Sequence, residues 1–134
     1  MSYAGSAALQ QAVFGALESD AALAGLVGEA IHEEPPAGAM PPLWVTLGAE
    51  SARERTSAGR LGSRHDFVVT VVSEDGGFAR AKAAAGAVCD ALDGSNPPLA
   101  RGRVVAMSFV RARASRRGGT RRIDLTFRAF LDDL

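Results

Sequence analysis

The chain has 134 residues, of which 47% are hydrophobic and 22% charged, and its formal net charge is zero. This length suits one domain with a single core, and the composition is that of a globular protein, which excludes a disordered chain. No apolar run approaches the roughly 20 residues of a membrane-spanning helix, and the N-terminal MSYAGSAALQQ lacks the basic and apolar regions of a secretory signal. A lone Cys89 excludes an internal disulfide. We therefore expect one soluble, intracellular domain over residues 1–134 and no membrane partner.

The charges are unevenly distributed along the chain. Residues 1–50 contain six acidic residues and no Lys or Arg, residues 51–99 contain six of each sign, and residues 100–134 contain nine arginines against three aspartates. Fourteen of the fifteen basic residues are Arg, which a GC-rich coding sequence would explain. Such a bias does not explain why the two signs are separated. We therefore expect the folded surface to be polarised as well.

Two helices and two short strands are predicted in the first fifty residues. Apolar residues recur at helical spacing from about Ser6 to Glu18. Ser19 or Asp20 can then N-cap a short helix, DAALAGLVG, that ends at Gly28. AIHEE is a possible short strand, PPAGAMPP is a proline-rich connection that cannot be helical, and the alternating run from Leu43 to Ala49 predicts a strand.

The middle of the chain predicts a loop, a strand and a helix. Glu50 to Ser63 is polar, contains glycines and has no periodicity, so we expect a long loop of a kind that is often functional. The next run is apolar on both faces from Phe67 to Val72, which suits a central strand. Asp75-Gly76-Gly77 ends this strand, and a helix with one apolar stripe follows from about Phe78 to Gly94.

Two long strands are predicted at the end of the chain, over roughly Arg103 to Ser115 and Thr120 to Leu131. Gly118-Gly119 between two alternating runs indicates a two-residue hairpin. The order of elements is then α-α-(β)-β-β-α-β-β. We expect an α+β fold in which a mostly antiparallel sheet of four to five strands has its helices packed on one face.

The register of this hairpin determines which side chains point outward. Pairing Arg117 with Thr120 gives one largely apolar face, and a one-residue slip would mix the two faces. The same register places Arg113 opposite Asp124, where the two could form an ion pair. The outward face then has arginines beside an apolar patch, a combination typical of protein interfaces. The arginines are Arg111, Arg113, Arg122 and Arg128, with Arg116, Arg117 and Arg121 around the tip, and the patch is Val105, Met107, Phe109 and Phe130, with Met107 opposite Phe130 and Phe109 opposite Arg128.

No catalytic, cofactor-binding or metal-ligating pattern is found in the sequence. The two histidines, His32 and His65, have neither metal-pair spacing nor a nucleophile motif around them, and a surface or structural role is favoured for each. Gly76-Gly77 before a helix could hold a phosphate, but the adjacent Glu74 and Asp75 would repel an anion. We predict that the chain is not an enzyme and has no catalytic residue, cofactor or metal.

Taken in order, these segments resemble the tail-completion, or tail-terminator, proteins of long-tailed bacteriophages and gene transfer agents. The resemblance runs from ALQQAVFGALESDAALAGLVG through IHEEPP and PPLWVTLGAE to RHDFVVTVVSEDGGFARAKAAAGAVCDALDG and RRIDLTFRAF, which is nearly the whole chain. Two positions depart from the family pattern. Val72 stands where an aromatic residue is common, and Trp44 stands where Tyr is common.

The resemblance implies a structural protein that forms a ring, usually a hexamer, on the head-proximal end of the completed tail tube. Such a ring stops tube polymerisation and joins the tail to the head connector, while DNA passes through its lumen without specific binding. The implied partners are other copies of the chain, the tail-tube protein, and the head-side connector or stopper protein. The implied location is the tail of a phage or phage-like particle that is assembled in the bacterial cytoplasm.

A ring requires that one patch of each subunit binds a different patch of its neighbour. An acidic N-terminal half and a basic C-terminal hairpin suit this head-to-tail pairing. We expect the predicted loop and the arginine tip to be assembly contacts. The residues expected at protein interfaces are Arg53, Arg55, Arg60, Met107, Phe109, Arg111, Arg113, Arg116, Arg117, Arg121, Arg122, Arg128, Phe130, Glu29, Glu33 and Glu34.

Two other functions are compatible with the sequence. A nucleic-acid-binding module could use the arginines of the hairpin, because β-ribbons enter grooves and arginines contact phosphates. The acidic half of the chain argues against it. A small enzyme with an unrecognised site around His32 or His65 is the least favoured alternative.

Overall fold

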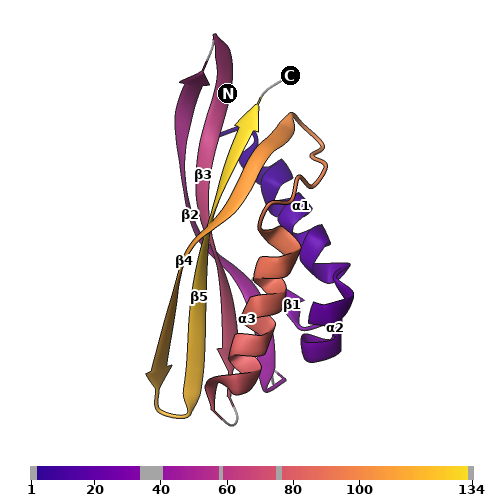
Figure 1. Ribbon diagram of the computed structural model, residues 1–134, viewed down its shortest axis with the longest axis vertical. Helices are drawn as coiled ribbons and strands as arrows, with labels where there is room; N and C mark the ends of the chain where they lie inside the picture. The colour runs from indigo at the N-terminus through magenta and orange to yellow at the C-terminus, as the bar shows by residue number, and fades with distance from the viewer. Residues whose placement is uncertain (1–2, 34–40, 58, 75–76, 133–134) are drawn as a thin grey trace.

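The computed structural model describes residues 3–33, 41–57, 59–74 and 77–132. These residues form an α+β domain, as predicted, in which all helices lie on one face of a mixed five-stranded sheet (Figure 1). The helices are α1 (Ser6–Glu18), α2 (Ala21–Val27) and α3 (Phe78–Leu92). The strands are β1 (Ile31–His32), β2 (Leu43–Ser57), β3 (Arg60–Ser73), β4 (Arg103–Arg117) and β5 (Thr120–Asp132).

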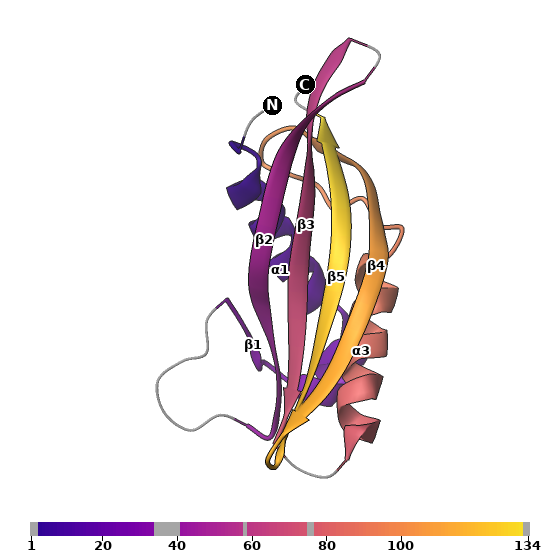
Figure 2. The ribbon, with the colours of Figure 1, turned by 90° about the vertical axis from the view of Figure 1, so that its left-hand side faces the viewer.

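The strand order is β1-β2-β3-β5-β4, so the sheet has β1 at one edge and β4 at the other. The short β1 runs parallel to β2, and every other neighbouring pair is antiparallel. Turning the molecule shows the four long strands in front of the helices (Figure 2). None of the described helices covers the second face of the sheet, and below we call it the open face.

Local sequence accounts for the helices. The carboxylate of Asp20 accepts a hydrogen bond from the backbone N–H of Leu23 at 2.9 Å, which makes Asp20 the N-cap of α2. Gly28 ends this helix with a φ of 60° that a side chain would oppose. The apolar side of α1 is buried through Leu9 and Leu17 against the sheet. A helix with one apolar stripe must cover a sheet or another helix, and here both N-terminal helices and α3 do so.

The segment predicted as a loop, Glu50 to Ser63, is instead the projecting part of the β2–β3 hairpin. Its pairing is continuous from Glu50 opposite Phe67 to Ser57 opposite Arg60. The hairpin extends past the helices at the upper end of Figure 1. Most described side chains in this part of β2 are exposed, so no apolar alternation marks it as a strand. Backbone ladder bonds do not require apolar side chains, which is why the loop prediction was wrong.

The C-terminal hairpin follows the predicted register only near its tip. Pairing runs as expected from Arg117 with Thr120 to Arg111 with Thr126. Two bulges in β4, between Phe109 and Arg111 and between Val104 and Ala106, then shift it. A bulge adds one residue to one strand and so reverses which side chains face the core. The predicted pairs at the base of the hairpin are therefore wrong.

This shift moves two residues of the predicted outward patch to the helix side of the sheet. Met107 lies opposite Ala129 and is only 2% exposed, and Phe109 lies opposite Phe127. The rings of Phe109 and Phe127 make an edge-to-face contact with centroids 6.0 Å apart. Phe130 keeps its predicted outward position. On this same face the guanidinium of Arg55 lies 4.4 Å from the centre of the Phe130 ring.

Gly62 provides a test of how closely β3 and β5 approach. A Cβ atom on Gly62 would lie 2.6 Å from the backbone oxygen of Leu131, and the backbone cannot easily move away. We expect Gly62→Ala to lower the free energy of unfolding by about 1–3 kcal/mol. Gly15→Ala in α1, where a Cβ meets nothing within 4 Å, should raise it by about 0.5–1 kcal/mol. Urea unfolding of both variants measures this, and equal stability of the two would contradict the structure.

Candidate protein interface on the open face

The open face of the sheet contains most of the predicted interface arginines. Residues paired across neighbouring strands point to the same side of a sheet, so one face collects side chains from four strands. β2 contributes Arg53 and Arg55, β3 contributes Arg64, β4 contributes Arg111 and Arg113, and β5 contributes Arg122 and Arg128. Arg64 was missed by the sequence reasoning because it follows the segment taken as a loop. Its position is readable only from the pairing of β3.

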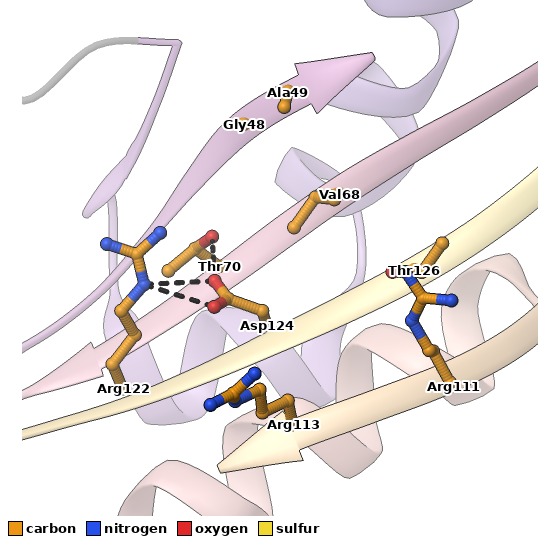
Figure 3. Close-up of a pocket in the computed structure, with 9 residues that line it drawn as sticks. All are labelled: Gly48, Ala49, Val68, Thr70, Arg111, Arg113, Arg122, Asp124 and Thr126. Atoms are coloured by element: carbon orange, nitrogen blue, oxygen red, sulfur yellow. Dashed lines mark hydrogen bonds and ion pairs between the residues drawn. The ribbon is translucent and has the colours of Figure 1, made fainter. Parts of the chain in front are cut away.

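A groove of about 500 Å³ crosses the half of this face nearer the β4–β5 turn, which is the lower half in Figure 2 (Figure 3). Its lining comes from a bulge in β2 and from the three following strands of the sheet. The bulge lies between Leu47 and Glu50 and brings two small residues to the groove, so nothing large fills it. The lining residues are Gly48, Ala49, Val68, Thr70, Arg111, Arg113, Arg122, Asp124 and Thr126.

Asp124 is the only acidic residue that lines this groove among the residues that the structure describes. Its carboxylate accepts hydrogen bonds from the Thr70 hydroxyl at 2.8 Å and from Nε of Arg122 at 3.0 and 3.2 Å. Asp124 lies opposite Arg113, as predicted. The predicted ion pair between those two is not formed, however, because Arg122, two residues earlier on the same strand, occupies the carboxylate.

The groove therefore has an excess of positive charge. Three guanidinium groups face one carboxylate, and that carboxylate pairs with Arg122. Arg111 and Arg113 are exposed, and within the described part of the chain neither forms a hydrogen bond or an ion pair. Figure 3 shows both extending from β4 along the groove. Two such arginines suit carboxylate or phosphate groups of a partner.

The upper half of the open face is different, because most of its arginines already interact within the chain. Asp66 accepts Nε of Arg128 at 2.8 Å and a terminal nitrogen of Arg64 at 3.0 Å. The hydrogen bond from Arg128 lowers the pKa of Asp66; burial opposes this, and Arg64 adds to the lowering. Arg55 stacks on Phe130. Within the described part of the chain, the groove thus holds two arginines without an internal partner, and Arg53 is the one such arginine in the upper half.

The remaining predicted interface residues lie in several places. At the tip, Arg116 and Arg117 are exposed, while Arg121 donates to the backbone oxygen of Gly119 at 2.9 Å. Glu29 and Glu33 are exposed beside β1, at the opposite edge of the sheet. Met107 is buried beneath the segment after α3, whose Gly94 donates to its backbone oxygen, so its expected outward exposure is wrong. The list is completed by Phe109 (40% exposed, on the helix side), by Arg53 (exposed), and by Arg60 and Glu34, whose side chains lie outside the described residues.

A partly buried network of hydrogen-bonded polar side chains lies at the N-terminal end of α1, and sequence reasoning did not find it. His65 and Ser63 are fully buried, and the Ser63 hydroxyl lies 2.9 Å from Nε2 of His65. Nδ1 of His65 lies 3.2 Å from Glu50, which also accepts the hydroxyls of Tyr3 and Ser6, each at 2.7 Å. The carboxylate can only accept, so Nδ1 of the ring donates to it.

The order of groups in this network, a hydroxyl, an imidazole and a carboxylate, is that of a hydrolase triad. Ser63 has no exposed surface, so a substrate cannot reach its hydroxyl in this fold. Burial raises the pKa of Glu50, but the hydrogen bonds from Tyr3, Ser6 and His65 outweigh it, and the pKa is lowered. This hydrogen-bonded network holds Tyr3 and the start of α1 against the projecting hairpin, which is a structural role.

The described residues contain no group of three or more His, Cys, Asp or Glu that could hold a metal ion. Within the same residues, no helix is long and apolar enough to cross a membrane. Burial raises the pKa of the Cys89 thiol, and the carboxylates of Asp93 and Asp90 raise it further. Cys89 is therefore held as a thiol rather than as a reactive thiolate.

Comparisons with known proteins place this fold. The family model described as tail completion protein gp17 matches residues 11–132. A solved chain described as part of the virion of a native gene transfer agent particle matches with a TM-score of 0.91 and 46% sequence identity. That match covers 98% of this chain and 99% of the other. A comparison with curated protein sequences found no match.

Proposed function

The chain belongs to the gp17 family of tail completion proteins, and from this premise we propose that it is a structural component of the tail of a phage-like particle, possessing no catalytic role. The observation that carries the proposal is the match to a chain of a gene transfer agent virion at 46% identity over nearly the full length of both. The family description concerns tail completion and names no reaction.

We further propose that copies of the chain form a ring, which we expect to be hexameric, on the head-proximal end of the tail tube. There it stops tube polymerisation and contacts the head-side connector, while DNA passes through the lumen. The charge distribution supports head-to-tail contacts, because the open face and hairpin of one copy are basic and the segment around Glu29 and Glu33 is acidic. Arg111 and Arg113 are the two groove residues that are free to meet those acids.

The proposal is tested by adding the purified chain to polymerising tail-tube protein from the same particle. We expect tubes of limited length with one capped end, as seen by electron microscopy, and a shift of the length distribution that depends on the ratio of the two proteins. A matched sample with the chain unfolded by heat serves as control. Tubes that grow equally long with and without the folded chain, and that never bind it, would refute the proposal.

One observation favours a second function. The positive groove with two exposed arginines could bind phosphates of DNA rather than carboxylates. Binding that is tight at low salt and falls steeply with salt, measured by fluorescence anisotropy with duplex and single-stranded DNA, would favour a nucleic-acid-binding module. Weak binding that is equal for any polyanion would favour the protein interface.

A further inference from the structure

The edge of the sheet formed by β4 has two halves that differ in what covers them. In the first half of β4, residues around the C-terminal end of α3 form hydrogen bonds with the outward backbone groups of the strand. Gly94 donates to the backbone oxygen of Met107 at 2.8 Å, and Asp93 accepts the N–H of Phe109 at 2.9 Å. The side-chain amide of Asn96 donates to the backbone oxygens of Val104 and Val105. This half cannot receive another strand.

The second half, residues 110–117, has no such cover. Among the described residues, none bonds to its outer edge, and every residue in it is exposed. Because Arg117 and Thr120 flank a two-residue turn, they exchange the two ladder hydrogen bonds with each other. The alternation of the ladder then directs the N–H and C=O groups of Ala112, Ala114 and Arg116 away from β5. An unpaired edge of this kind is a template for another strand.

An apolar hollow lies behind the free edge. It has a volume of about 260 Å³ between α3 and β4, and Ala112 and Ala114 line it together with Cys89 and Phe109. These two alanines are small, so α3 and the strand do not close over the gap. A second hollow, of about 750 Å³, lies at the opposite edge of the sheet, where Phe14 of α1 lines it with Ile31 of β1. At both edges the helix layer thus leaves room beside the sheet.

Charge selects the strand that fits the free edge. Residues 110–117 contain four arginines and no acid, so pairing with the same segment of another copy would place like charges side by side. The other edge strand, β1, is flanked by the exposed Glu29 and Glu33 and lies in a half of the chain without Lys or Arg. Its acids complement the arginines of β4.

We propose that the free edge of β4, residues 110–117, pairs with the β1 edge of a second copy, so that the sheet continues from one subunit into the next. This inference rests on the proposed ring and specifies how its subunits join. The contact is heterologous, because the two edges are different strands, and repetition of it gives a ring when the rotation closes. The N–H of Ile31 in β1 already donates to the Glu29 carbonyl at 2.8 Å, so the backbone bonds run from the outward N–H groups of β4 to carbonyl groups of β1. The Glu–Arg contacts select the partner edge.

Ala114→Pro tests the backbone contact in the full chain. Proline removes the outward N–H, while the ladder to β5 keeps its bonds because that N–H does not take part in them. Sedimentation up to about 1 mM protein detects dissociation constants in the millimolar range. We expect the unmodified chain and the control Ala114→Ser to associate with concentration, and Ala114→Pro to remain monomeric with unchanged circular dichroism. An unmodified chain that is monomeric throughout, or a proline variant that associates equally well, would overturn the inference.

Two further measurements keep the test decisive if the proline variant folds poorly. Hydrogen exchange of the Ala112 and Ala114 amides in the unmodified chain should slow as its concentration rises. Glu29→Lys combined with Glu33→Lys should weaken association at least tenfold, and unchanged association would show that β1 is not the partner edge. Failure of the proposed function is distinguishable, because tube capping by the unmodified chain is measured separately. Capping that persists in Ala114→Pro refutes the edge contact alone.

Discussion

Replacing Arg111 and Arg113 by glutamate is expected to weaken the proposed capping of tail tubes strongly while leaving the fold intact. Both side chains are exposed and line the open groove, and within the described residues neither has an internal partner. Close charge pairs across interfaces couple by about 1.5 kcal/mol or more. Two lost pairs therefore predict at least about a 100-fold higher concentration for tube capping. The measurement is the capping titration with tube protein, beside thermal unfolding of the same variant.

The matched control makes the same charge change away from the groove. Arg80→Glu combined with Arg101→Glu alters two exposed residues, one in α3 and one in the segment after it, that line neither the groove nor the hollow behind β4. This variant should cap tubes at the same concentration as the unmodified chain. If both double variants lose capping equally, net charge rather than the groove is responsible. If neither does, the groove is not an assembly contact.

Replacing Glu50 by alanine is expected to have the largest effect on stability among the polar substitutions considered. The carboxylate is the shared acceptor of Tyr3, Ser6 and His65, and the ring of His65 is fully buried. A buried polar group without a partner costs about 1–3 kcal/mol. The variant should therefore lose about 2–4 kcal/mol of unfolding free energy, or about 10 °C in melting temperature. Urea and thermal unfolding measure this directly.

Glu54→Ala on the same strand is the control, because Glu54 is exposed. It should change stability by no more than about 0.5 kcal/mol. The stabilisation from Glu50 also predicts a pH dependence. Its folded pKa lies below the ordinary value of 4.5, so the stabilisation is complete at neutral pH and is lost as pH falls through the folded pKa. The difference in unfolding free energy between the unmodified chain and Glu50→Gln should therefore become smaller below about pH 4. A difference that grows on acidification would contradict the stabilising role of the Glu50 carboxylate.

Two of the sequence interpretations that the structure corrects share a physical cause. Period-two alternation reports a strand only where one face is buried, and the projecting end of β2 is mostly exposed on both faces. The register of the C-terminal hairpin was readable from its glycine turn, but a bulge adds no signal of its own to a run of alternating residues. Met107 and Phe109 were therefore assigned to the wrong face, whereas Arg111 and Arg113, between the bulge and the turn, were assigned correctly.

The sequence by itself determined the fold class, the order of most elements, the hairpin at Gly118-Gly119 and the separation of acidic from basic residues. Each of these depends on local periodicity, turn chemistry or composition, which neighbouring residues encode. Only the tertiary structure decided which arginines are free. Asp66 and Asp124 pair with Arg128 and Arg122 through strand pairing and side-chain reach, which leaves Arg111 and Arg113 as the groove arginines without an internal partner among the described residues. The free edge of β4 is likewise a property of strand order, which no local pattern records.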